Sequence, residues 1–279
     1  MAIVWYCTGM KRFVLLAKSV GETPLASLEA YRAAHPEYAD TPMAYAGRLD
    51  PMASGKLLIL IGEECKRQEH YHNLDKEYEF EVLFGVSSDT ADVLGLLREH
   101  APAFLPRERI ADAARSLFGE IALPFPHFSS KTVGGKPLHT WALEGRISEI
   151  EIPLKHSRIH RLDVLDTYAR SAAEIYDEAI RKIETIPPVT DPRKSLGKDF
   201  RRTEVRASWG SFKESISPGA RFTIARMRAI ASSGTYMRSL AEALGEQVGL
   251  PALAYSIDRT QIGRYFPIGT SHGFWFRRY

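Results

Sequence analysis

The segment AGRLDPMASGKLLILIGEECK, residues 46–66, places one carboxylate, that of Asp50, in a turn that runs directly into an apolar stretch. The glycines and the proline around Asp50 are turn formers, and the stretch 57–61 has the length and composition of a buried strand. An acidic residue in such a turn most often faces water. A stiff turn above a buried strand can also hold a carboxylate for catalysis. The rest of the chain decides between the two.

The composition is that of a soluble globular protein and gives no sign of a metal site. Of its 279 residues, 44% are hydrophobic and 25% are charged, which suits one large domain or two modest ones. Two cysteines, Cys7 and Cys65, are too few for a disulfide framework or a zinc site, and the nine histidines lack ligand spacing. Residues 1–13 are too short for a signal or a membrane span. We therefore expect a cytoplasmic protein with no metal and no membrane association.

The positive charge of the chain is concentrated in its C-terminal half. The formal net charge of +3 and the pI near 8.8 allow a polyanionic partner without requiring one. In RKSLGKDFRRTEVR, residues 193–206, six cations including Arg201 and Arg202 accompany two acids. A polyphosphate would bind in this half, although such charge runs are as often solvated surface. The aromatic and cationic tail 263–279 could stack bases or pack on the core.

Hydrophobic periodicity predicts a mixed α and β chain with no long linker and no repeat, which favours a single domain. Short apolar runs and period-two alternation predict strands, and apolar residues at helical spacing predict helices. The last helix should end at Gly249, before Pro251. The predicted strands are 13–18, 57–62, 77–85, 157–167 and 203–209, and the predicted helices are 106–119, 171–184 and 235–248.

Four segments, in order along residues 13–265, resemble the motifs of the TruB family of RNA pseudouridine synthases. The first is GRLDPMASG at 47–55, which resembles the family's loop with an aspartate followed by proline. The second and third are DKEYEFEVLFGVSSDTADVLG at 75–95 and SSGTYMRSLAEALGEQVG at 232–249. The last is YSIDRTQIGRY at 255–265. Related synthase families share an Arg-Leu-Asp loop, but Pro51 and the helix start at 234–236 favour the TruB branch.

The resemblance implies an α+β fold, with a mixed, mainly antiparallel central sheet flanked by helices. It also implies a single catalytic domain over residues 1–279, with an RNA-clasping insertion around 125–160. The chain stops about fourteen residues past the last motif, so we expect no C-terminal RNA-binding domain of the PUA type. We further expect a monomer that grips RNA through its core, the insertion and the basic segment.

The reaction implied by the resemblance is the isomerisation of uridine to pseudouridine, which uses no cofactor. This agrees with the lack of a GxGxxG, P-loop or metal-ligand pattern in the sequence. Asp50 matches the essential acid, acting either as a nucleophile at C1′ or as the base for the C2′ proton. Arg238 matches the arginine that keeps this acid ionised and oriented. Tyr78 matches the tyrosine that stacks on the flipped uracil and later takes the C5 proton.

The same resemblance suggests further residues that contact the substrate. Tyr45 stands where the family has a histidine, and Ile257 where it has a pocket leucine. Each candidate also has an ordinary structural explanation, as a core aromatic, a strand cap or a solvated cation. The substrate-binding candidates are Tyr45, Lys76, Tyr236, Ile257, Arg201 and Arg202.

The leading substrate is the uridine at position 55 in the T-loop of transfer RNA, so the expected partner is the T-arm of that RNA. A first alternative is a non-catalytic chaperone that clamps and refolds transfer RNA with the same fold. A second is a synthase that acts on another RNA. A nucleoside glycosidase would need a second carboxylate near Asp50. The nearby candidates, Asp89 and Asp92, suit turn formation.

Overall fold

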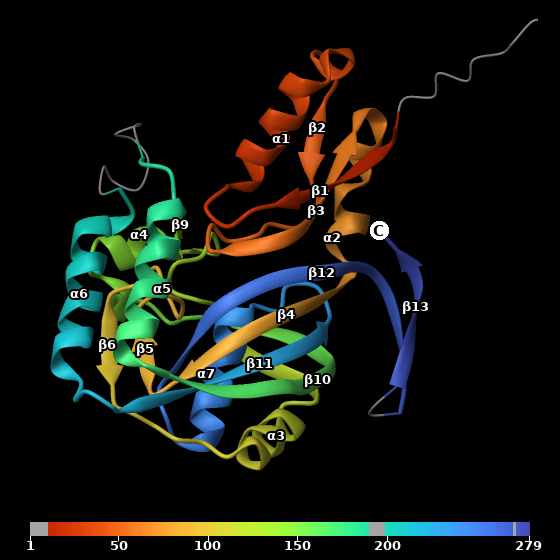
Figure 1. The fold of residues 1–279 in the computed structure, drawn as a ribbon. Helices are drawn as coiled ribbons and strands as arrows, with labels where there is room; N and C mark the ends of the chain where they lie inside the picture. Colours follow the sequence, from red (N-terminus) through yellow and green to blue (C-terminus); the bar gives the residue numbers. More distant parts are fainter. Residues whose placement is uncertain (1–10, 190–198, 270–271) are drawn as a thin grey trace, which may run out of the picture.

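A nine-stranded mixed sheet organises the protein in this computed structural model, which describes residues 11–189, 199–269 and 272–279 (Figure 1). The segment 193–198 of the predicted basic patch lies outside these residues, as does Cys7. The strands of the sheet are β1 (Phe13–Lys18), β2 (Met43–Tyr45), β3 (Ala53–Ile61), β4 (Asp75–Phe84), β7 (Gly119–Pro124), β10 (Leu154–Ser171), β11 (Arg221–Ala231), β12 (Ala252–Ile268) and β13 (His272–Arg278).

The strand order is β1-β3-β12-β4-β11-β10-β7, with β2 added beside β3 and β13 beside β12. Among the described strands, every pair in this sheet is antiparallel except β3 with β12, which is parallel and aligns Ala53 with Ile257. The predicted α+β class with a mixed, mainly antiparallel sheet is therefore confirmed. The parallel pair brings together two segments that are about 200 residues apart in sequence.

Helices and two short ribbons complete the described chain. Helix α7 packs beside β12, α3 packs beside α7 and β10, and α5 and α6 pack on each other (Figure 1). None of the described helices is long and apolar enough to cross a membrane. The helices are α1 (Pro24–Ala34), α2 (Gln68–His72), α3 (Arg107–Ser116), α4 (Leu138–Leu143), α5 (Ala172–Thr185), α6 (Arg202–Ser215) and α7 (Met237–Val248); the ribbons pair β5 (Val86–Ser88) with β6 (Leu97–His100) and β8 (Thr132–Val133) with β9 (Lys136–Pro137).

The hydrophobic pattern of the sequence explains the central strands. In β3, residues 57–61 are all buried, as expected for an apolar run without alternation. In β4, Tyr78, Phe80 and Val82 are buried, whereas the intervening glutamates are partly exposed. This is the predicted strand with one wet face.

The helix ends also lie where local signals in the sequence predict them. Ser171 and Glu174 form a capping box at the start of α5, each accepting a hydrogen bond from the other's backbone N–H. Helix α7 ends at Gly249, whose φ of 72° is left-handed, as predicted. The helices expected at 106–119, 171–184 and 235–248 are all present, within two or three residues of their predicted ends.

One predicted strand is wrong. Residues 203–209 belong to α6, because the buried side chains are Val205, Trp209 and Phe212, which follow helical spacing. The same stretch also alternates apolar and polar residues at 205, 207 and 209, and this alternation led to the strand prediction.

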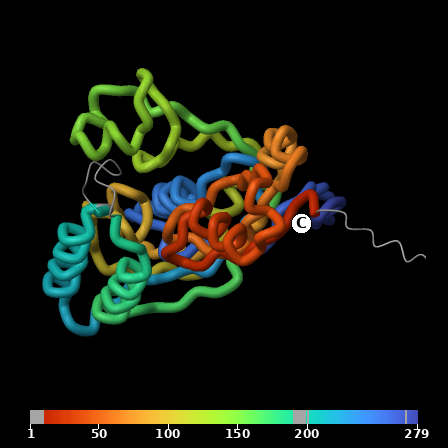
Figure 2. Tube along the Cα trace, turned by 90° about the horizontal axis from the view of Figure 1, so that it is seen from above, coloured from red at the N-terminus to blue at the C-terminus, as the bar shows by residue number. Residues whose placement is uncertain are grey.

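The segment expected to be an insertion leaves the sheet after β7 and returns as β10. It therefore covers residues 125–153, and residues 154–160 belong to the sheet, where they pair with β7. We call residues 125–153 the excursion. Viewed from above, it forms a lobe that stands apart from the α5–α6 pair (Figure 2).

Gly55 should be essential to the parallel contact. Its φ is +106°, and a Cβ built there would lie 2.4 Å from the carbonyl oxygen of Arg259 on β12. We predict that Gly55→Ala lowers the free energy of unfolding by roughly 2–4 kcal/mol in urea denaturation, because both backbone strain and a backbone clash result. Gly210→Ala, in α6 with open space around it, is the control and should raise stability by roughly 0.5–1 kcal/mol. Equal effects of the two changes would contradict this prediction.

Candidate active site

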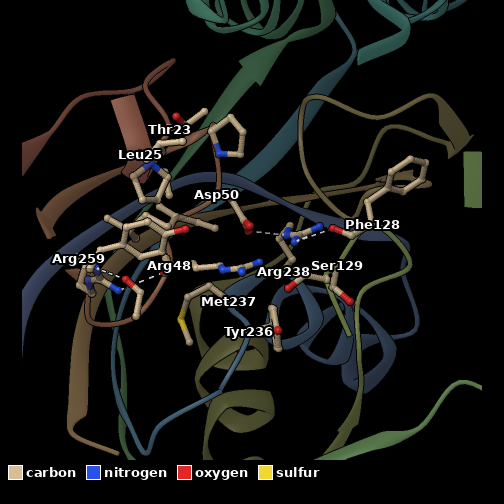
Figure 3. Close-up of a pocket in the computed structure, with 18 of the residues that line it drawn as sticks. Thr23, Leu25, Arg48, Asp50, Phe128, Ser129, Tyr236, Met237, Arg238 and Arg259 are labelled. Atoms are coloured by element: carbon tan, nitrogen blue, oxygen red, sulfur yellow. Dashed lines mark hydrogen bonds and ion pairs between the residues drawn. The ribbon is translucent and has the colours of Figure 1, made fainter. Parts of the chain in front are cut away.

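The turn that carries Asp50 is held from below by one buried arginine. Arg259, on β12 and only 1% exposed, donates hydrogen bonds to the carbonyl oxygens of Gly47 (3.3 Å), Arg48 (3.2 Å) and Lys56 (2.7 Å). Leu49 is buried in the core beneath the turn. Because the neighbouring residue Leu49 is anchored in the core, the side chain of Asp50 projects from the opposite side of the turn, into a cavity (Figure 3).

Asp50 forms an ion pair with Arg238 at the wall of this cavity. The Nε atom of Arg238 donates to Oδ2 of Asp50 at 2.8 Å. Its two other nitrogens donate to the carbonyl oxygens of Thr90 (3.0 Å) and Phe128 (3.2 Å). The Arg238 side chain is 4% exposed, whereas that of Asp50 is 35% exposed. The guanidinium is therefore fixed, and the carboxylate remains open to a ligand.

A second carboxylate, Asp92, lies on the same arginine. Its Oδ2 is 3.8 Å from Nε of Arg238, and its Oδ1 accepts hydrogen bonds from the Thr90 hydroxyl and the Leu94 N–H. Burial raises the pKa of Asp92 to about 6, against the opposing effect of Arg238. For Arg238, burial lowers the pKa, but the two carboxylates outweigh this and leave the pKa raised. Arg238 is thus kept charged between two acids.

Tyr78, Ile257 and Lys76, three of the residues singled out in the sequence, line the same cavity as Asp50. Tyr78 is 9% exposed, and it is close enough to Arg259 to raise the pKa of that guanidinium, against the larger lowering effect of burial. The Nζ atom of Lys76 donates to the carbonyl oxygens of His72 and Leu74. Burial lowers the pKa of Lys76 to about 7, and the neighbouring positive charge of Arg259 adds to this shift.

Tyr236 and Tyr45 also line the cavity. Tyr236 immediately precedes α7, and its ring meets that of Phe125 edge to face at 5.6 Å. Burial raises the pKa of Tyr236, and the charge of Asp50 adds to this effect. The excursion contributes Phe128, Ser129 and His139 to the same cavity. The site is therefore built from several distant segments of one chain.

The structure brings Arg201 to the cavity but not Arg202. Arg201 lines the cavity, pairs with Asp89 at 2.5 Å and lies over the ring of Phe128. Arg202 is turned inward, where its guanidinium donates to the carbonyl oxygens of Ile183 and Ile186 and pairs with Asp199. Both carbonyl groups lie at the C-terminal end of α5, where a helix runs out of intrahelical N–H donors. We therefore do not retain Arg202 as a substrate contact.

Two residues of the site were not singled out from the sequence. Arg259 lies inside the last motif quoted above, two residues after Ile257, but nothing local in the sequence shows that it anchors a turn 200 residues away. Asp92 was interpreted as a turn former, and its bonds to Thr90 and Leu94 fit that role. Its contact with Arg238 appears only in the folded chain.

The cavity has a volume of about 1170 Å³, somewhat larger than typical small-molecule pockets. Its lining combines the partly exposed Asp50 carboxylate, a buried guanidinium and tyrosine rings. The described residues contain no cluster of three or more potential metal-ligand side chains.

Comparisons with known proteins identify the family of this chain. A family model for the N-terminal domain of TruB family pseudouridylate synthases matches residues 38–179. The chain is 31% identical over 206 residues to the tRNA pseudouridine synthase B of Caldicellulosiruptor saccharolyticus. The aligned segment covers 68% of this chain and 69% of the relative. The chain is 29% identical over 224 residues to the enzyme of the same name from Deinococcus deserti, with 80% and 66% covered. The protein therefore belongs to the TruB family of pseudouridylate synthases.

The fold has a counterpart among solved structures. A chain in the crystal structure of a Cbf5–Nop10–Gar1 complex superposes with a TM-score of 0.52 at 15% sequence identity. The match covers 90% of this chain and 48% of the other. The present chain thus spans about two thirds of the length of the two sequence relatives and about half of this structural one.

The lowered pKa of Lys76 predicts a pH-dependent stability. The folded-state pKa is about 7, against 10.5 ordinarily, so between these values the unfolded chain binds more protons and stability rises with pH. Relative to Lys76→Met, the wild type should gain roughly 1 kcal/mol of unfolding free energy per pH unit between about pH 7.5 and 9.5. Urea denaturation of both proteins measures this difference. Lys66→Met, at an exposed lysine outside the cavity, is the control, and a flat difference for Lys76→Met would contradict the prediction.

Proposed function

We propose that this protein converts uridine to pseudouridine in RNA, and that its substrate is the T-loop uridine of transfer RNA. Family membership supports the reaction, and the name shared by the two relatives supports transfer RNA as the substrate. The observation that carries the proposal is the ion pair between Asp50 and Arg238 at the wall of a cavity of about 1170 Å³.

The reaction breaks the bond between C1′ and N1 of the uridine, turns the uracil, and joins C1′ to C5. A proton leaves C5 and N1 gains one, so the product is an isomer and no redox equivalent is consumed. The base must first leave its stack in the RNA for the carboxylate to reach the ribose. A cavity that encloses the detached uracil favours its return to the same sugar over its loss to solvent.

Asp50 supplies the reactive group in this proposal. Its carboxylate is the partly exposed member of the ion pair, and the contact with Arg238 at 2.8 Å orients it. It acts either as the nucleophile at C1′ or as the base that removes the C2′ proton. Both roles need an ionised carboxylate held against the ribose, and the anchored turn provides this.

Tyr78 and Ile257 supply the surface on which the uracil rests. Both side chains line the cavity beside Asp50. An aromatic ring offsets the stacking that the base loses when it leaves the RNA. Of the buried aromatic residues on β4, only Tyr78 also carries a hydroxyl that can take part in proton transfer from C5.

We further propose that the excursion, residues 125–153, clasps the RNA, and that one copy of the chain suffices as a cytoplasmic monomer. The excursion contributes Phe128, Ser129 and His139 to the cavity, and the carbonyl oxygen of Phe128 accepts a hydrogen bond from Arg238.

Asp50→Asn tests the reaction. We expect release of tritium from a transfer RNA transcript labelled at uridine C5 to fall by roughly 1000-fold or more, because the amide can neither attack C1′ nor accept the C2′ proton. RNA binding should persist. Asp112→Asn, at an exposed aspartate of α3 that pairs with Arg115, is the control and should release tritium at the wild-type rate. Wild-type protein that binds the transcript without releasing tritium would indicate a chaperone instead.

Tyr78→Phe separates stacking from proton transfer. The phenyl ring keeps the platform but removes the hydroxyl, so RNA affinity should stay within a factor of about two, while the single-turnover rate falls by roughly 10²–10⁴. Tyr78→Ala should weaken binding as well as the rate. An unchanged rate for Tyr78→Phe would limit this residue to stacking.

A further inference from the structure

The cations that line the cavity differ in whether the protein itself neutralises or hydrogen bonds them. Five have partners among the described residues: Arg32 with Glu29, Lys76 with two carbonyl oxygens, Arg201 with Asp89, Arg238 with Asp50, and Arg259 with three carbonyl oxygens. The side chain of Arg48 makes no hydrogen bond or ion pair with any described residue, although it lines the same cavity. Among the described cations of the cavity, Arg48 is therefore the one whose guanidinium has no hydrogen-bond or ion-pair partner in the described part of the chain.

Arg48 is held in place through its backbone. Its carbonyl oxygen accepts a hydrogen bond from Arg259, and the next residue, Leu49, is buried in the core. Arg48 is exposed, and its side chain extends into the cavity toward the Asp50–Arg238 pair (Figure 3). The main chain of Arg48 is thus anchored, whereas its guanidinium has no hydrogen-bond or ion-pair partner among the described residues.

The charge of Arg48 acts inside the site. It is one of the groups that influence the pKa of Tyr236, which it lowers against the larger effect of burial. Arg48 stands two residues before Asp50, so an anion bound by its guanidinium would lie close to the catalytic carboxylate. An anion held there is part of the substrate.

We propose that Arg48 binds a backbone phosphate next to the target uridine and so positions the ribose over Asp50. This rests on the proposed function. Each ribose of RNA is flanked by two phosphates, which carry the full negative charges of the chain. A guanidinium binds a phosphate through two parallel hydrogen bonds, which fix distance and direction together. Arg48 is a positioning residue, and the chemical step remains with Asp50.

The alternative role for Arg48 is electrostatic support of Asp50. That role would lower the rate at saturating RNA without changing RNA affinity. A phosphate contact would weaken binding, reduce its salt dependence and leave the saturated single-turnover rate nearly unchanged. The two roles therefore differ in which measurement changes.

The test compares Arg48→Gln and Arg48→Lys with the wild type on a transfer RNA transcript. For Arg48→Gln, we expect RNA affinity to fall about 10-fold and the slope of log affinity against log salt to decrease by about one. The single-turnover rate at saturating RNA should stay within about threefold. Arg48→Lys should recover most of the slope, because it keeps the charge, but only part of the affinity, because it loses the paired donors.

Two controls make the result specific. Arg115→Gln removes an exposed arginine on α3, outside the cavity, and should leave affinity and slope unchanged. A transcript with a neutral methylphosphonate on either side of the target uridine should bind the wild type more weakly than the natural transcript does. The same transcript should bind Arg48→Gln no more weakly than the natural transcript does. Equal losses for both proteins, or an Arg48→Gln variant with unchanged affinity and slope, would overturn the proposal. Absence of tritium release from wild-type protein would overturn the proposed function, whereas these binding measurements would still decide the role of Arg48.

Discussion

The hydrogen bonds from Arg259 to the carbonyl oxygens around the turn that carries Asp50 hold the site together. An arginine that is 1% exposed and has no carboxylate partner among the described residues is costly to bury, and burial lowers its pKa. The cost is offset because the guanidinium has five N–H donors in one plane, and the turn presents several carbonyl oxygens that need donors. Gly47, Arg48 and Lys56 are joined to β12 in this way. The position of Asp50 thus follows from a packed strand rather than from a free loop.

The second arginine of the site, Arg238, differs from Arg259 because it pairs with carboxylates. It lies between Asp50 and Asp92, and only Asp50 is partly exposed. The buried partner compensates the guanidinium from the side of the core, so the exposed carboxylate can approach a substrate without being the sole counter-ion. The third arginine, Arg48, has a side chain without a partner among the described residues. Arg259 therefore anchors the turn, Arg238 is compensated by two carboxylates, and Arg48 is the one that we propose contacts the substrate.

The sequence predicts much of this arrangement, where the signals are local. The turn formers around Asp50, the alternation in β4 and the glycine stop at 249 each depend on residues close together in the chain. The pairing of Asp50 with Arg238 followed from the resemblance between motifs, and the hydrogen bond at 2.8 Å agrees with it.

Other features depend on distant contacts and could not be predicted in this way. Residues 203–209 fit both a strand and a helix, and packing of Val205 and Trp209 against the core selected the helix. From the sequence alone, Arg202 is interpreted as a surface cation. In the structure, its guanidinium donates hydrogen bonds to carbonyl oxygens at the end of α5. The role of Arg259 depends on the parallel pairing of β3 with β12, which no local pattern encodes.

The parallel pairing also sets when the site can form during synthesis. β3 is made first, and its partner residues on β12, 257–259, follow about 200 residues later. Contacts of such high sequence separation form slowly and only after the intervening chain is available. A nascent chain that already carries Asp50 therefore lacks the strand that shapes the turn around it. The geometry of the turn is therefore complete only once residues 257–259 have been made and have paired with β3.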